Sequence, residues 1–312
     1  MHRRQFLYMG AAAGLSAAAG AVAGNAATGR LMTMDLVCGA IGVRATLAEA
    51  IELAARHGFE SVGGDMTALA AMGAEERQGI AELLRSKGLK WGAAGLPVEF
   101  RRDEETFRKD MEKLGRSAAA WREVGGTRVG TWIMPNHDTL TYLQNLRQHV
   151  ERLRETADIL ADHGLRLGLE YVGPKTSWTA RRFPFIHTMA EMKDLLEGID
   201  RSNVGFILDS WHWYTAGEQE SDLLSLTHDQ VVAVDLNDAP AGIPVDQQMD
   251  LKRKLPTATG VIDVRTFLRA LIKIGYDGPV RAEPFDESLN GLPADEAVAR
   301  TAAAMKAAFA LI

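Results

Sequence analysis

The sequence predicts an α/β protein that folds as one closed (β/α)8 barrel. From residue 33 onward, eight short β-branched or apolar runs alternate with longer amphipathic segments. Several of these segments end at a glycine, as helices do where the backbone turns into the next strand. No Gly-x-Gly-x-x-Gly turn or Walker motif is present. Eight parallel strands close more naturally into a barrel than into an open sheet, so the barrel is the predicted class.

The elements follow one another in regular order. The predicted strands are Asp35–Val43, Glu60–Gly64, Lys90–Gly95, Thr127–Met134, Arg166–Val172, Val204–Asp209, Val231–Asn237 and Pro279–Pro284. The predicted helices are Leu47–His57, Glu75–Lys87, Glu104–Glu123, Leu140–His163, Thr188–Gly198, Val264–Ile274 and Pro293–Leu311. The glycines expected to close helices are Gly58, Gly88, Gly125, Gly164 and Gly275. No linker or low-complexity run divides residues 31–312, which indicates a single domain.

Composition excludes several classes of function. The 312 residues carry a formal charge of −6 and show no clustered Lys/Arg face, which argues against a nucleic-acid partner. The single cysteine excludes an internal disulfide and a cysteine-based zinc cluster. A small-molecule partner fits this balance better, and a homo-oligomer stays open.

The first thirty residues differ from the rest of the chain. The pair Arg3 and Arg4 precedes a weakly apolar, Ala/Gly-rich run that reaches Ala23, where small residues suit a signal peptidase. We interpret residues 1–30 as a Tat-type signal peptide with a disordered lead. The run is too short and glycine-rich for a convincing membrane span, although an uncleaved anchor is the alternative. We therefore expect an exported, periplasmic protein without stable membrane insertion after cleavage.

Four successive predicted strands, the fifth to the eighth, each carry one acidic residue toward the barrel interior. Side chains alternate along a strand, so apolar neighbours that face the helices leave these acids facing the axis. They are Glu170, Asp209, Asp235 and Glu283. Each alone fits a salt bridge at the barrel rim equally well, but four at matching positions predict a shared site at the C-terminal strand ends, where barrel enzymes place their chemistry.

Four converging carboxylates would repel one another unless a cation lay between them. An oxygen-rich cluster favours Mn²⁺ or Mg²⁺ over softer metals. We therefore expect a divalent metal, first of all Mn²⁺, with Mg²⁺, Co²⁺ or Zn²⁺ as alternatives, held by Glu170, Asp209, Asp235 and Glu283.

The motifs around these acids resemble a known family. "LGLEYVG", "ILDSWHWY", "VDLNDAP" and "VRAEPF" are similar to the xylose-isomerase-like sugar phosphate isomerase/epimerase family, within the AP endonuclease 2 superfamily of TIM barrels. The resemblance covers residues 33–312. It implies metal ligands at Glu170, Asp209 and Glu283 and a substrate-contacting histidine at His212. The family's usual histidine ligand on the seventh strand is replaced by Asp235, which leaves metal binding at that position open.

Further candidates for substrate contact lie near the predicted strand ends. They are His137, Trp211, Asp65 and Arg253. Each also has an ordinary structural interpretation, as a loop or cap residue, a packed aromatic or a solvated cation. The long segments 172–187 and 239–260 are expected to form walls or lids of the barrel mouth.

The predicted activity is a sugar isomerase or epimerase reaction. One of Glu170 and Glu283 removes a proton next to a carbonyl to give an enediolate, and the other returns a proton. Loss of a neighbouring oxygen from the same intermediate would make the enzyme a dehydratase or lyase instead. Export favours a free ketose or a keto-glycoside over a sugar phosphate. A non-catalytic sugar-binding barrel is a further alternative, whereas a nuclease would need more histidines and a basic groove.

Overall fold

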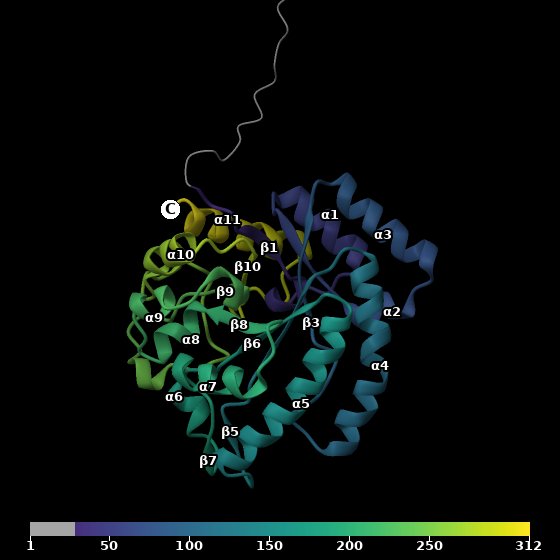
Figure 1. Cartoon of the computed structure of the whole chain (residues 1–312). Coiled ribbons are helices and arrows are strands. Elements are labelled where there is room, and N and C mark those ends of the chain that lie inside the picture. The colour runs from purple at the N-terminus through teal and green to yellow at the C-terminus, as the bar shows by residue number, and fades with distance from the viewer. Residues whose placement is uncertain (1–28) are drawn as a thin grey trace, which may run out of the picture.

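The computed structural model describes residues 29–312 and confirms the predicted barrel. Eight parallel strands close in the order β1-β10-β9-β8-β6-β4-β3-β2, with helices outside them (Figure 1). The barrel strands are β1 (Thr33–Leu36), β2 (Ser61–Gly64), β3 (Lys90–Gly95), β4 (Arg128–Trp132), β6 (Arg166–Glu170), β8 (Val204–Asp209), β9 (Val231–Leu236) and β10 (Pro279–Ala282). A small antiparallel pair, β5 (Asn136–His137) with β7 (Phe183–Pro184), joins the segments that follow β4 and β6.

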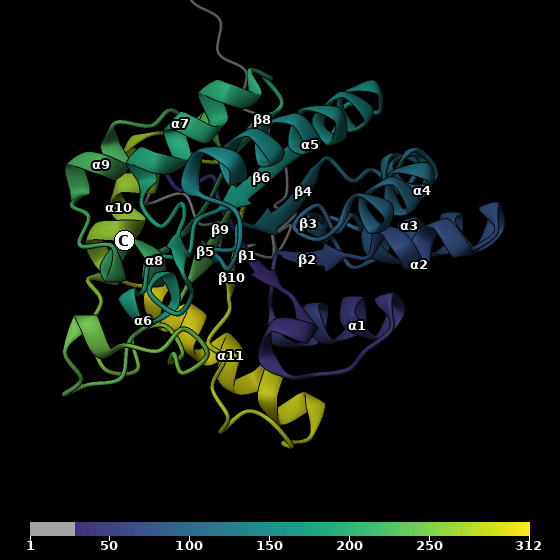
Figure 2. The same cartoon turned by 90° about the horizontal axis from the view of Figure 1, so that it is seen from below.

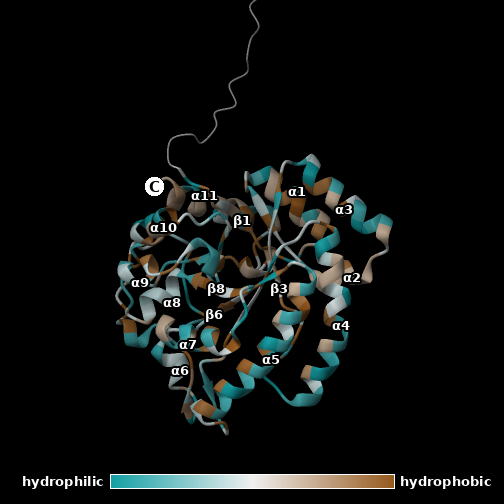
Figure 3. Ribbon diagram, in the orientation of Figure 1, coloured by the Kyte–Doolittle hydropathy of each residue, from teal (hydrophilic) through white to brown (hydrophobic). Residues whose placement is uncertain are grey.

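The larger helices form a ring around the strands, which Figure 2 shows from below. They are α1 (Leu47–His57), α3 (Ala74–Ser86), α4 (Glu104–Glu123), α5 (Tyr142–Asp162), α7 (Met189–Ile199), α10 (Val264–Lys273) and α11 (Ala294–Phe309). Hydrophilic residues gather on their outward faces (Figure 3), and their apolar faces bury the core against the barrel. All five predicted closing glycines have positive φ, from 66° to 96°. This is the left-handed conformation that glycine adopts without steric cost.

Several short elements differ from the prediction. The predicted first strand is too long: β1 ends at Leu36, and Cys38–Ile41 form a 3₁₀ helix that closes at Gly42 with φ 74°. Helix α2 (Met66–Ala71) was not predicted, and it begins because Asp65 accepts hydrogen bonds from two backbone amides of its first turn. The remaining short elements are α6 (Lys175–Trp178), α8 (Ser210–Thr215), α9 (Glu220–Leu224), and 3₁₀ turns at His228–Gln230 and Val245–Gln247.

Small residues leave room inside the barrel. A Cβ at Gly130 or Gly168 would lie 2.7 or 2.8 Å from the side chain of Ile207, so this isoleucine fills the space that both glycines leave. A Cβ at Gly92 would lie 2.4 Å from Oδ1 of Asp35. These positions need glycine because a neighbouring side chain occupies the axis of the barrel.

The predicted signal segment lies almost wholly outside the described residues. None of the helices within residues 29–312 is both long and apolar enough to cross a bilayer.

Candidate active site

The structure brings the four predicted carboxylates together. Glu170 ends β6, Asp209 ends β8, Asp235 lies on β9, and Glu283 follows β10 directly. One oxygen from each lies within 4.8 Å of the others. Glu170, Asp209 and Asp235 are buried, and Glu283 is partly buried. The predicted convergence at the C-terminal strand ends is therefore confirmed.

Burial makes the charged form of this cluster costly. The pKa of Asp209 is raised to about 7, chiefly by burial and also by the neighbouring carboxylates Asp235 and Glu283, against the lowering effect of Arg253. The pKa of Glu170 is raised well above its usual value by burial and then by the charges of Asp235, Glu283 and Asp209. Burial also raises the pKa of Glu283. A cation among these oxygens would favour the ionised forms.

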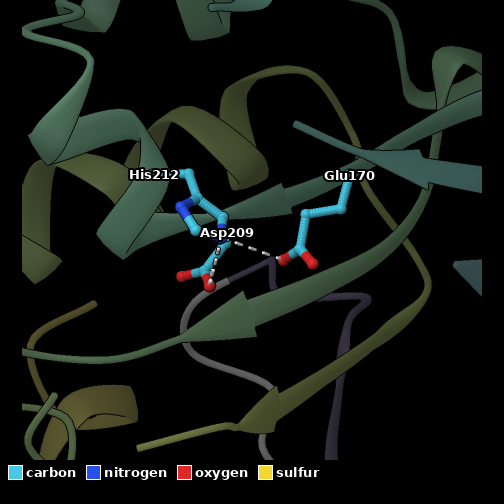
Figure 4. A group of neighbouring side chains, drawn as sticks. All are labelled: Glu170, Asp209 and His212. Carbon is cyan, nitrogen blue, oxygen red and sulfur yellow. Dashed lines mark ion pairs between the residues drawn. The ribbon is translucent and has the colours of Figure 1, made fainter. Parts of the chain in front are cut away.

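His212 faces the cluster from α8. Its Nδ1 accepts a hydrogen bond from the backbone amide of Gly173 at 3.1 Å, so the neutral ring carries its proton on Nε2. Burial lowers the pKa of His212 to about 3, which keeps the ring neutral. Nε2 lies 3.8 Å from a carboxylate oxygen of Glu170 and 3.8 Å from one of Asp209 (Figure 4). Nη2 of Arg253 lies closer to Nε2, at 3.2 Å, so two donors lie side by side between the acids, in a position to contact a substrate oxygen.

Arg253 comes from the segment between β9 and α10 and enters the same cluster. Its Nη1 donates to Asp209 Oδ2 at 2.7 Å and to Glu283 Oε2 at 3.2 Å. Its Nη2 donates to Asp250 Oδ1 at 2.8 Å. The guanidinium also lies over the rings of Trp211 and Phe285, with centroid distances of 5.6 and 4.7 Å. A buried guanidinium with these partners is held in one orientation.

Arg281 on β10 is a second cation at the site. Its Nε donates to Asp235 Oδ1 at 2.5 Å, and its Nη2 donates to Asp235 Oδ2 at 2.8 Å and to Glu283 Oε1 at 3.2 Å. Asn237 links the neighbouring strands, because its Nδ2 donates to Asp209 Oδ1 and its Oδ1 accepts from the amide of Glu283, both at 2.9 Å. These polar contacts fix the acids relative to one another.

A cavity of about 1010 Å³ opens above the cluster. Glu170, His212, Arg253 and Glu283 line its inner end, together with Arg281, Asp250 and Asp35. Its outer walls are largely apolar and include Leu96, Val98, Trp132, Met134, Leu251 and Phe285. A deep pocket with convergent polar groups and perturbed pKa values is the usual place for small-molecule chemistry.

Three predicted contact residues lie elsewhere. Asp65 caps α2, and His137 Nδ1 accepts from the amides of Thr139 and Leu140. Trp211 is fully buried beneath Arg253. None of Asp65, His137 and Trp211 is among the residues that line the cavity described here. Their predicted contact with substrate stays a prediction.

The donor set fits a divalent metal. Oε1 of Glu170 is buried and has no hydrogen-bond partner within residues 29–312, although it faces the other acids. An unpartnered buried carboxylate oxygen is costly, and a cation would satisfy it. Glu170, Asp209 and Glu283 would hold such an ion, and Asp235 is close enough to join them.

The fold and this site define a class of protein. A family model described as xylose isomerase-like TIM barrel matches residues 51–308. The chain belongs to this family.

Its curated relatives are enzymes. Inosose isomerase from Bacillus velezensis is 25% identical over 221 residues, which are 70% of this chain and 75% of that protein. The 3-dehydroshikimate dehydratase of Pseudomonas putida is 26% identical over 81% of this chain but only 38% of its own length. Ketose 3-epimerase from Arthrobacter globiformis is 30% identical over 48% of this chain and 45% of that protein. These relatives support an enzyme of the sugar isomerase, epimerase or dehydratase kind.

Solved structures share the fold over most of the chain. A xylose isomerase domain protein from Alicyclobacillus acidocaldarius superposes with a TM-score of 0.79 at 30% identity and covers 90% of this chain and 99% of that one. The IOLI protein, in a crystal structure with a binding zinc atom, superposes with a TM-score of 0.73 at 22% identity, covering 88% of this chain and 96% of that one.

Proposed function

We propose that this protein is a divalent-metal-dependent sugar isomerase or epimerase acting on a ketose or keto-glycoside. The observation that carries the proposal is the set of buried carboxylates at the inner end of a large cavity, with Oε1 of Glu170 left unpartnered within residues 29–312. The inosose isomerase and ketose 3-epimerase relatives support this reaction class. We infer Mn²⁺ as the ion because oxygen ligands predominate.

Bound among Glu170, Asp209 and Glu283, the metal would supply Lewis acidity that makes the C–H bond beside a substrate carbonyl more acidic. The chain's own residues then move the proton. Glu170 comes from β6 and Glu283 from β10, so these two acids approach the cavity from strands separated by β8 and β9. One removes the proton to give an enediolate, and the other returns a proton to the opposite face or to the neighbouring carbon.

His212 and Arg253 orient the sugar. The Nε2–H of His212 donates to a substrate oxygen between Glu170 and Asp209. The guanidinium of Arg253, which Asp209 and Asp250 hold in place, puts a positive charge beside that oxygen. Because both side chains are buried and held in place, they need little rearrangement when charge develops on the substrate.

A dehydratase or lyase reaction is the second candidate. The match to 3-dehydroshikimate dehydratase over 81% of this chain favours it. Both reactions begin with the same proton abstraction, so product identity is what separates them.

Solvent hydrogen exchange tests this proposal. Metal-loaded protein is incubated in D₂O with ketoses and keto-glycosides, and deuterium uptake is measured by NMR. We expect uptake at one carbon beside the carbonyl and a loss of about 10³-fold or more in Glu170→Gln and in Glu283→Gln. Glu151→Gln, at an exposed position on α5, is the matched control and keeps wild-type exchange. Near-normal exchange in either active-site variant would contradict the two-glutamate assignment.

Export through the Tat pathway to the periplasm is also part of the proposal, since residues 1–30 carry the twin arginines. Replacing Arg3 and Arg4 by lysine should retain the protein in the cytoplasm, which cell fractionation measures. Unchanged fractionation would contradict this assignment.

A further inference from the structure

Arg281 occupies an unusual place in the barrel wall. It pairs in register with Asp235 on β9 on one side and with Asp35 on β1 on the other. Residues paired across parallel strands point to the same side, so a guanidinium lies between two buried aspartates on the inside of the barrel. One of these aspartates, Asp235, is a predicted metal ligand.

The contacts of Asp235 differ from those of the other acids. Both of its oxygens accept from the same guanidinium, at 2.5 and 2.8 Å, in a two-pronged ion pair, and its side chain is fully buried. Asp209 meets a guanidinium through one oxygen only: its Oδ2 accepts from Arg253 at 2.7 Å, whereas its Oδ1 accepts from neutral donors, the Trp211 amide and Asn237. Oε1 of Glu170 has no partner within the described part of the chain. The charge of Asp235 is thus already matched by a resident cation.

A dication bound to Asp235 would lie beside this guanidinium. Like charges at such separation in a buried site repel strongly, and the two-pronged geometry of the ion pair would be lost. Glu283 meets Arg281 and Arg253 through single contacts of 3.2 Å, which leave it freer to turn toward a metal.

We propose that Arg281 withholds Asp235 from the metal, so that Glu170, Asp209 and Glu283 alone hold the ion and the guanidinium binds the substrate beside it. This inference rests on the proposed function. Arg281 lines the cavity, and its Nη1 makes no hydrogen bond within residues 29–312 while its other donors hold Asp235 and Glu283. It therefore has the two N–H groups of Nη1, on the edge of the guanidinium away from Asp235, available to a substrate oxygen.

Metal binding tests this assignment without measuring turnover. Protein freed of metal by a chelator is titrated with MnCl₂, and free Mn²⁺ is followed by electron paramagnetic resonance. The Asp209→Asn variant, which removes a ligand, should bind about 100-fold more weakly. Arg281→Met frees Asp235 from its partner and should bind about tenfold more tightly.

The double variant Asp235→Asn with Arg281→Met removes a neutral pair and leaves no unpaired buried charge. It should bind Mn²⁺ within about threefold of the wild type, since no ligand is lost. Circular dichroism confirms that each variant is folded, and the double variant serves where Arg281→Met alone does not fold.

The outcomes separate the two proposals. A double variant as weak as Asp209→Asn would show that Asp235 is a ligand and overturn this inference alone. A folded Arg281→Met that binds no more tightly than the wild type would also overturn it. Absence of Mn²⁺ binding in the wild type would overturn the metal-dependent function and this inference together.

Discussion

The two halves of the barrel wall present different side chains to the cavity. Strands β6, β8, β9 and β10 carry carboxylates and Arg281 inward, and they place the acids within 4.8 Å of one another. Strands β3 and β4 present uncharged and mostly small residues, Ala93, Ala94, Gly95, Gly130 and Thr131, with Trp132 at the end of β4. From this difference we infer a division of roles: the charged strands would supply the catalytic groups, and the uncharged residues of β3 and β4 would leave room for a substrate.

The largest effect is expected from Arg253, the residue that links the charged half to the loop above it. In Arg253→Lys, one ammonium replaces a guanidinium that contacts Asp209, Glu283 and Asp250 together. Because lysine cannot reproduce this fork of donors, kcat/KM should fall by about 10³-fold. Steady-state kinetics measure it, with Lys252→Ala at the exposed neighbouring position as the control. A loss below about tenfold would show that Arg253 does not position the substrate.

Asp35 lies where the two halves meet, and it should make stability depend on pH. Burial raises its pKa from 3.8 to about 6, so the folded protein holds a proton that the unfolded chain releases. Its contribution to the free energy of unfolding is therefore full below about pH 4 and is lost as the pH rises through 6, by about 3 kcal/mol.

Urea unfolding of metal-free protein between pH 4 and pH 8 measures this loss. Asp35→Asn should remove it, whereas the exposed Asp229→Asn should keep it. Identical pH profiles for Asp35→Asn and the wild type would mean that Asp35 does not titrate in this range.

The smallest effect is expected from a substitution on the uncharged side of the cavity, which β3 and β4 form. A Cβ added at Gly95 meets no atom within 4 Å, and this residue lines the cavity at the end of β3. Gly95→Val should fold normally and occupy space that a substrate needs, so KM should rise about tenfold while the thermal midpoint stays within about 2 °C. An unchanged KM would place the substrate away from β3.

The four acids were predictable because side-chain alternation within a strand is local. The run from Val280 to Glu283 placed Glu283 inside the barrel, and the same alternation places Arg281 inside as well. What it does not show is that Arg281 pairs with Asp235, because that contact depends on the register between β9 and β10. Sequence reasoning therefore missed Arg281 although its signal was present.

Residues brought in by loops were harder to predict. Arg253 was predicted to contact substrate from a wall segment, but its insertion between Asp209 and Glu283 was not predicted, because it depends on the path of residues 239–260. No periodicity marks Asp250, which holds Arg253. For Asp65 and His137, nearness to a strand end suggested substrate contact, but both side chains satisfy backbone amides of the turn that follows. At these two positions, a polar side chain near a strand end serves to cap the following turn, and the sequence alone does not distinguish this role from substrate contact.

The most direct measurement is a crystal structure of the protein grown with MnCl₂, using anomalous scattering at the manganese edge. We predict one anomalous peak per chain, bonded to oxygens of Glu170, Asp209 and Glu283, with Asp235 still paired to Arg281. A structure in which these three carboxylates bind no ion, with any manganese peak lying elsewhere, would contradict the metal site on which the proposed activity depends.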